Sequence, residues 1–199
     1  GVFKGNIASE NIFYFTIISN ILCFMMFSFL SVKTINEIKL YGIKGSTSMS
    51  PHIKGSILIS IILTMTVYHF ILIPYGLKMD PSKRLELADI ILHYIVPCLT
   101  IFDWILFDDK KRFKMYDPLI WIMIPLMYVI FIYVQAGHNF IEELNCGMDK
   151  YVYAFLNLEL LGKQAVESNI IKITAILIAI GYFLYGIDRI RLKKDEKFL

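Results

Sequence analysis

The sequence has little of the charge that a soluble domain carries on its surface. Only 19% of its 199 residues are charged and 57% are hydrophobic, against about 25% and about 45–50% in soluble domains. Glycine and proline are also few, at 11 and 6, and no Ser-rich or Gln-rich run is present, which argues against a flexible linker or a low-complexity tail. We therefore expect residues 1–199 to form a single transmembrane domain.

Cysteine, excess charge and familiar catalytic motifs are scarce as well. The three cysteines include no CxxC pair, so no structural disulfide is inferred. A net charge of only +3, spread over short loops, argues against a nucleic-acid partner. No phosphate-binding loop, HExxH or GxSxG motif and no internal repeat is present, so a nucleotide site, a zincin, a nucleophile elbow and a transporter have no local support. No cofactor or metal is predicted.

What the sequence does contain is a series of long apolar runs separated by charge clusters. A helix needs about 20 largely apolar residues to cross a bilayer, and the consecutive apolar positions within these runs do not fit the alternation of a β-barrel strand. The predicted fold class is therefore all-α, a polytopic transmembrane helix bundle. Five spans are predicted, at about residues 11–32, 56–74, 89–107, 119–135 and 170–187.

Two further expectations concern the ends of the chain. Lys and Arg are uneven, since 13 of the 20 follow the first, third and fifth spans, and such an excess marks the cytoplasmic side. We therefore expect a multi-pass protein of the cell membrane with a cytoplasmic C-terminus. The chain starts at Gly1 without methionine, so a sixth helix is an open alternative for the native chain.

Polar groups at membrane depth are costly, and each one is a candidate functional residue. Thr16 lies five residues into the first predicted span and His93 four residues into the third, and both spans enter from the outside. At 1.5 Å per residue both residues lie roughly 6–8 Å below the outer boundary. His69 lies near the outer end of the second span and His138 follows that of the fourth. These positions predict a pocket in the outer leaflet.

Neighbours on the same helices are candidates for supporting roles. Asn20 lies one turn after Thr16, and Asp89 lies one turn before His93, so each shares a face with its partner. Asn20 and the hydroxyl of Ser19 are candidate donors to an oxyanion, and Asp89 is a candidate to orient the histidine. The structural alternative is that a threonine of a membrane helix bonds to its own backbone or packs at a helix contact.

Other conspicuous residues are interpreted structurally. Trp121, Tyr128 and Tyr133 are assigned to the core or to the aromatic belts at the membrane surface. Asp108 and the basic residues 110–112 are interpreted as a solvated ion-pair cluster at the inner end of the third span. Pro97 is expected to free the carbonyl of the residue four positions earlier and to kink the third span.

Several short blocks then occur in an order that resembles a known family. They are FYFTIISNIL at 13–22, HYIVP at 93–97, DWILF at 103–107, Trp121 with Pro125 and Tyr128, and YVYAFL at 151–156. In this order they resemble the bacterial branch of the androgen-induced-gene-like family, whose animal members include the ADTRP hydrolases. The blocks cover most of the chain.

The resemblance implies a multi-pass membrane enzyme that hydrolyses fatty acid esters of hydroxy fatty acids with a threonine nucleophile and a histidine base. By resemblance these roles fall on Thr16 and His93, the pair that the depth estimate already places level. We expect His69, Pro97 and Tyr153 to line the substrate pocket. The expected partners are a fatty acid ester or another lipid and the bilayer, and no oligomeric state is predicted.

The sequence departs from the family pattern in the fifth block and in the second span. Val152 and Ala154 occupy positions where prolines are common in the family, and His69 stands where an asparagine is expected. These departures leave the substrate preference open.

Three alternatives stay open at this point. A related branch of membrane proteins transfers acyl groups with a cysteine nucleophile, for which Cys98 is the candidate. The histidines at 69, 93 and 138, with Glu142 one turn beyond the last, also match the donor set of a catalytic zinc site, although from separate helices. The third alternative is a non-enzymatic lipid-binding or transport protein, in which the polar residues only hold helices together.

Overall fold

The computed structural model describes residues 13–42, 49–82, 84–138 and 150–190, and within these ranges it contains helices and no strand. Five helices in these ranges are long and apolar enough to cross a membrane, which confirms the predicted all-α bundle.

The first span is α1 (Phe15–Tyr41), and the fifth is α10 (Lys163–Arg189). The second comprises α2 (Pro51–Val67), the π turn η3 (Tyr68–Leu72) and α3 (Ile73–Met79). The third comprises α4 (Leu87–Ile90), the π turn η4 (Ile91–Ile95) and α5 (Val96–Phe107). The fourth comprises α6 (Asp117–Trp121) and α7 (Met123–Gly137).

The helices extend past the predicted boundaries because backbone hydrogen bonding continues beyond the apolar stretch. The first span was expected to end at residue 32, but α1 continues to Tyr41 and ends where Gly42 adopts a φ of +68°, a conformation that glycine adopts without strain. Pro51 opens α2 five residues before the expected start, and its fixed φ suits a first helical position. The predicted start of the first span at residue 11 lies outside the described residues.

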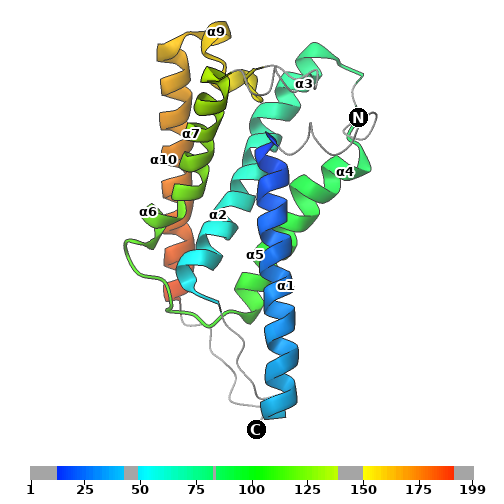
Figure 1. Ribbon diagram of the computed structural model, residues 1–199, viewed down its shortest axis with the longest axis vertical. Helices are drawn as coiled ribbons and strands as arrows, with labels where there is room; N and C mark the ends of the chain where they lie inside the picture. Colours follow the sequence, from blue (N-terminus) through cyan, green and yellow to red (C-terminus); the bar gives the residue numbers. More distant parts are fainter. Residues whose placement is uncertain (1–12, 43–48, 83, 139–149, 191–199) are drawn as a thin grey trace.

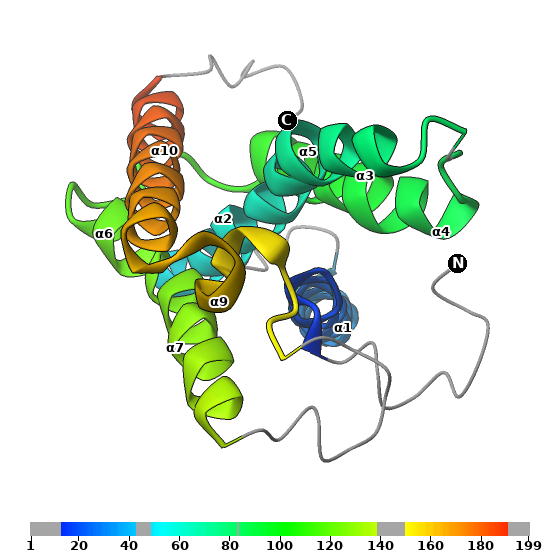
Figure 2. The same cartoon turned by 90° about the horizontal axis from the view of Figure 1, so that it is seen from above.

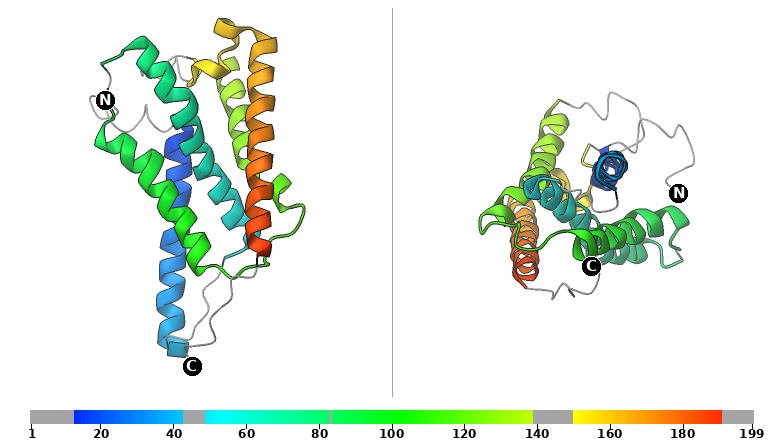
Figure 3. Two further views of the ribbon diagram at one scale, coloured as in Figure 1. Left: turned by 180° about the vertical axis from the view of Figure 1, so that it is seen from behind. Right: turned by 90° about the horizontal axis from the view of Figure 1, so that it is seen from below.

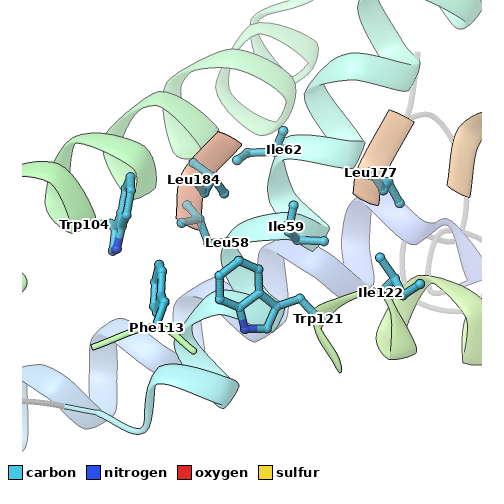
Figure 4. Close-up of a cluster of buried hydrophobic side chains, with 9 residues drawn as sticks. All are labelled: Leu58, Ile59, Ile62, Trp104, Phe113, Trp121, Ile122, Leu177 and Leu184. Atoms are coloured by element: carbon cyan, nitrogen blue, oxygen red, sulfur yellow. The ribbon is translucent and has the colours of Figure 1, made fainter. Parts of the chain in front are cut away.

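The second span occupies the middle of the bundle. Figures 1 and 3 show α2 crossing between α7 and α10 on one side and the third span on the other, with α1 beside it. The main core cluster forms around α2, and Figure 4 shows Trp121 and Phe113 closing it from below. Trp121 packs so closely on Gly55 that a Cβ at that position would lie 2.2 Å from the indole. The structure thus places Trp121 in the core.

A second, aromatic cluster surrounds the start of α1. It joins Phe15 to Tyr128 and Ile132 of α7, and to the segment that leads into the short 3-10 turn η5 (Ala154–Leu156). That segment continues into α9 (Leu158–Leu161), which Figure 2 shows beside the start of α10. The hydroxyl of Tyr128 donates to the Phe13 carbonyl at 2.8 Å. Chain segments far apart in sequence therefore hold the first residues of α1 in place.

Both π turns are followed by a proline. Leu72 ends η3 two residues before Pro74, and Ile95 ends η4 two residues before Pro97. A proline lacks the N–H for an α-helical bond, and its ring clashes with the carbonyl four residues earlier. The preceding turn widens instead, and the Val96 N–H bonds to a carbonyl five residues back. The irregularity that Pro97 was expected to cause in the third span thus takes the form of a wide turn.

The end of the bundle where α2 begins differs from the prediction. Lys54 precedes the second span as predicted from residue 56, but it lies in the first turn of α2, is 5% exposed, and donates to Asp103 at 2.7 Å and to Asp108. Asp108 is therefore half-buried and paired with a buried lysine, so the predicted solvated ion pair does not describe this residue. Sequence spacing could not show that α2 starts early enough to bring Lys54 against the third span.

Candidate functional site

Thr16 and His93 meet at the end of the bundle where α1 begins. Thr16 Oγ1 lies 3.2 Å from His93 Nε2, although the residues are 77 positions apart in the chain. The other ring nitrogen, Nδ1, lies 3.0 Å from the backbone carbonyl oxygen of Asp89. A carbonyl only accepts, so Nδ1 must carry the proton, and in the neutral ring Nε2 then accepts from the threonine hydroxyl. The geometry thus places a base beside a hydroxyl.

The start of α1 positions the hydroxyl. Tyr14 has an extended backbone conformation and precedes the helix, and its carbonyl accepts the N–H groups of Ile17 and Ile18 at 3.0 and 3.2 Å. Thr16 is therefore the second residue of the helix. The N–H of Phe15 donates to the hydroxyl of Tyr153 at 3.1 Å, which satisfies one of the free donors at a helix start.

The π turn η4 and an aromatic neighbour position the imidazole. His93 is 7% exposed and lies in the middle of η4. Tyr68, from η3, stacks on it with ring centroids 3.6 Å apart. Sequence analysis did not single out Tyr68, because a tyrosine near the end of a membrane helix has the same signature as an interfacial belt residue.

The predicted oxyanion donors take another role. The amide of Asn20 donates to the carbonyls of Thr16 at 2.8 Å and Leu92 at 3.2 Å, so both of its hydrogens are engaged. The hydroxyl of Ser19 bonds to the Thr16 carbonyl at 3.0 Å and to Thr64 Oγ1 at 2.7 Å. Both residues hold α1 against its neighbours, as the structural alternative for polar groups in membrane helices describes. Neither side chain has a free donor for an oxyanion.

Asp89 holds the ring of His93 through its backbone carbonyl, one turn earlier in the chain. Its carboxylate accepts the Glu86 N–H at 3.4 Å as part of a capping box at the start of α4, and it is also a hydrogen-bonding partner of Tyr68. The spacing of one turn was therefore informative for the contact between Asp89 and His93.

A cavity opens beside Thr16. It has a volume of about 620 Å³, including its open part, and lies among α1, α2, α7 and α10. Its walls are mostly aliphatic and aromatic side chains, and Thr16 and Tyr153 are among the hydroxyl-bearing residues that line it. Of the three residues expected to line the pocket, Tyr153 does so. His69 and Pro97 are not among the described residues around this cavity.

His69 is part of a separate contact. Its side chain is exposed, and Nδ1 lies 3.0 Å from the hydroxyl of Tyr94. Pro97 is buried in α5, just after the wide turn that carries His93.

The alternatives for this site find less support in the described parts of the chain. There, no three side chains of His, Cys, Asp or Glu are grouped as metal ligands, and Glu142, named for the zinc alternative, lies outside the described residues. Cys98 is exposed on α5. The side-chain group that meets His93 Nε2 is the hydroxyl of Thr16.

Comparison with known proteins adds no assignment. No protein-family model, no curated protein and no solved structure matches this chain. The functional argument therefore rests on the geometry of the site.

Proposed function

We propose that this protein is an intramembrane lipid ester hydrolase in which Thr16 is the nucleophile and His93 is the general base. The observation that supports it most directly is the 3.2 Å contact between Thr16 Oγ1 and His93 Nε2, with the other ring nitrogen held by a carbonyl. A threonine hydroxyl is a weak nucleophile without an adjacent base, and a base oriented by a third group is the arrangement that activates it.

The reaction follows from this geometry. Thr16 Oγ1 attacks the ester carbonyl carbon while its proton moves to His93 Nε2. The tetrahedral intermediate collapses, the bond to the alcohol oxygen breaks, and His93 returns the proton to the departing alcohol. Water then attacks the acyl-threonine, again with His93 as base, and the products are the free acid and the original hydroxyl.

The cavity favours a long acyl chain as the substrate group. The residues of the second span that line the cavity run from Leu63 in α2 to Leu72 in η3. These nine residue steps, at 1.5 Å each, give the cavity a length of about 13–14 Å along the span. This is close to half of the bilayer hydrocarbon core of about 30 Å. The cavity therefore suits one acyl chain lying parallel to the spans, as in fatty acid esters such as those of hydroxy fatty acids.

We also propose the orientation that the distribution of positive residues favours, with the C-terminus cytoplasmic and the site in the outer leaflet half of the cell membrane. Water for the second step then comes from the nearby outer face. A fluorescent reporter that folds only in the cytoplasm, fused after Leu199, tests this. Fluorescence is expected, and a dark but intact fusion would contradict the orientation.

Hydrolysis of umbelliferyl esters of increasing chain length by the purified protein tests the activity. We expect Thr16→Val and His93→Gln each to lower kcat by at least about 10³-fold, because the nucleophile and its base act as a unit. Thr66→Val is the matched control, since the Thr66 hydroxyl bonds to the Ile62 carbonyl of its own helix at 2.8 Å. Its rate should stay within about twofold of the wild type.

Two results would overturn the proposal. One is a Thr16→Val protein that keeps most of its esterase rate. The other is a folded wild-type protein that binds fatty acids without turnover of any ester, which would support the non-enzymatic lipid-binding alternative. Fluorophosphonate labelling at Cys98 in place of Thr16 would instead favour acyl transfer by cysteine.

A further inference from the structure

The hydroxyl of Tyr153 lies at the start of α1, next to the proposed nucleophile. Tyr153 belongs to the segment between the fourth and fifth spans, and its side chain is 7% exposed. Its oxygen accepts the Phe15 N–H at 3.1 Å, and Thr16 is also a hydrogen-bonding partner of this hydroxyl. The rings of Tyr14 and Tyr128 pack edge-on against it at 5.9 and 6.3 Å. The phenol is therefore held from several sides.

The phenol keeps a proton of its own beside the nucleophile. Its oxygen already accepts from a backbone N–H, and the side chains that neighbour the O–H group are those of Thr16 and Tyr128. Burial raises the pKa of Tyr153 to about 12, so the group stays an O–H donor at neutral pH. The Thr16 proton is directed to His93, which leaves the threonine oxygen free to accept.

Other donors near Thr16 are engaged elsewhere. Asn20 and Ser19 bond within and between the helices, as described above. Tyr128 donates to the Phe13 carbonyl at 2.8 Å, and Thr64 donates to the Ser60 carbonyl at 3.2 Å. Tyr153 and Thr16 both line the cavity, so among these described groups Tyr153 is the donor beside Thr16 that is not already bonded to a backbone carbonyl.

On the basis of the proposed hydrolysis, we propose that Tyr153 is a catalytic residue whose O–H donates to the oxyanion of the tetrahedral intermediate. When Thr16 Oγ1 attacks, it becomes an ester-like oxygen and a weaker acceptor, while the former carbonyl oxygen gains a negative charge. The phenol O–H then donates to that oxygen. No proton leaves Tyr153 in this step.

Two features of α1 strengthen this donor. The Phe15 N–H polarises the phenol oxygen, and hydrogen bonds arranged in a chain reinforce one another. The oxyanion would also form at the N-terminus of a 27-residue helix, where the aligned peptide dipoles favour negative charge. A single well-placed oxyanion donor accounts for about 10²–10³ in kcat.

Tyr153→Phe tests the inference because it removes the hydroxyl and keeps the ring. We expect kcat for an oxygen ester to fall by about 10²-fold or more with KM within threefold of the wild type. Tyr133→Phe is the matched control, since the Tyr133 hydroxyl donates at 2.9 Å to the Leu156 carbonyl in the same segment. It removes an anchoring bond without touching Thr16, and its rate should stay close to that of the wild type.

A thionoester separates catalysis from positioning. Its sulfur replaces the oxygen that becomes the oxyanion and accepts hydrogen bonds weakly. The ratio of wild-type to Tyr153→Phe rates should therefore approach 1 for the thionoester. An equal loss on both esters, or no loss on either, would overturn the oxyanion role.

The outcomes also distinguish this inference from the proposed function. If Thr16→Val is inactive and Tyr153→Phe is fully active, only the oxyanion role fails. If the wild-type protein hydrolyses neither ester, both fail. Should Tyr153→Phe not fold, 3-fluorotyrosine at position 153 keeps the ring and both hydrogen bonds but ionises at lower pH. The alkaline loss of activity is then expected at lower pH than in the wild type, and an unchanged alkaline limb would overturn the role.

Discussion

The phenol ring of Tyr68 lies flat on the imidazole of His93, with ring centroids 3.6 Å apart and an angle of 12° between the planes. The two rings come from the two π turns, η3 and η4, and both side chains are buried. The carbonyl of Asp89 fixes one edge of the imidazole and Tyr68 covers one face. Together they keep Nε2 directed at Thr16.

Replacing Tyr68 should therefore affect the reaction more than the fold. An aromatic pair contributes about 0.5–1.5 kcal/mol beyond its buried area, so Tyr68→Leu should lower kcat up to about tenfold as the imidazole gains rotational freedom. Tyr68→Phe keeps the stacked ring and should lose much less. Steady-state kinetics on a long-chain ester measures both, and equal rates for the two variants would show that stacking does not orient His93.

Pro97→Ala should lower activity through the shape of the third span. An alanine supplies the missing N–H, which allows the wide turn to close into an α-helical one. One residue of an α-helix corresponds to about 100° of rotation, so closing the turn moves His93 relative to Thr16. We expect at least about a tenfold loss of kcat with unchanged helix content by circular dichroism. Full activity would mean that other contacts hold the turn open.

Lys54→Met should destabilise the inner end of the bundle in a pH-dependent way. It leaves Asp103 and Asp108 without their buried partner, a change that costs about 3–5 kcal/mol when a buried ion pair loses one member. Burial raises the pKa of Asp108, and Lys54 opposes this. The folded state therefore binds the Asp108 proton more tightly than the unfolded state does. The free energy of unfolding consequently increases as the pH falls through the folded-state pKa of Asp108, and it decreases as the pH rises through that pKa.

The loss in Lys54→Met should therefore be largest at neutral and alkaline pH and shrink in acid, where Asp108 is protonated and needs no counter-ion. Thermal unfolding in detergent across this range measures it. Lys163→Met is the control, since its side chain is 83% exposed, and exposed pairs contribute at most about 1 kcal/mol. A loss independent of pH would contradict the assignment to the ion pair.

Gly55→Ala should destabilise the core between α2 and α6. A Cβ there would lie 2.2–2.6 Å from atoms of the Trp121 ring, and overpacking costs about 1–3 kcal/mol. At Gly186 a Cβ meets nothing within 4 Å, so Gly186→Ala should leave stability unchanged or raise it by about 0.5–1 kcal/mol. The difference in melting temperature between the two alanine variants is the readout, and equal melting temperatures would contradict the close packing.

The five spans were predictable because hydropathy alone selects segments that can cross a bilayer. The pairing of Thr16 with His93 was predictable for a related reason. Once the spans and their alternating directions are known, the depth of each polar residue follows from the helical rise. Depth shows which residues lie at one level, and few polar residues share the level of Thr16.

The remaining geometry depends on helix rotation, which depth does not provide. Asn20 and Ser19 lie within one helical turn of Thr16, but the rotation of α1 directs them to backbone carbonyls and to Thr64. The Asp89 carboxylate turns to its own helix start, and its carbonyl takes the expected role. The stacking of Tyr68 on His93 depends on the two π turns, η3 and η4. The prolines that follow these turns indicate an irregular helix, but they do not predict the length of the turn.

The hydrogen bonds of Asn20 tie α1 to η4 one turn below the contact of Thr16 with His93. The proposed nucleophile and base thus belong to separate spans, and a few hydrogen bonds at this end of the bundle hold the register between the two spans. A slide of α1 by a single residue, about 1.5 Å, is enough to take a 3.2 Å contact out of hydrogen-bonding range. Because spans adjust to lipid thickness by tilting, the thickness of the surrounding bilayer becomes a variable of the chemistry at Thr16.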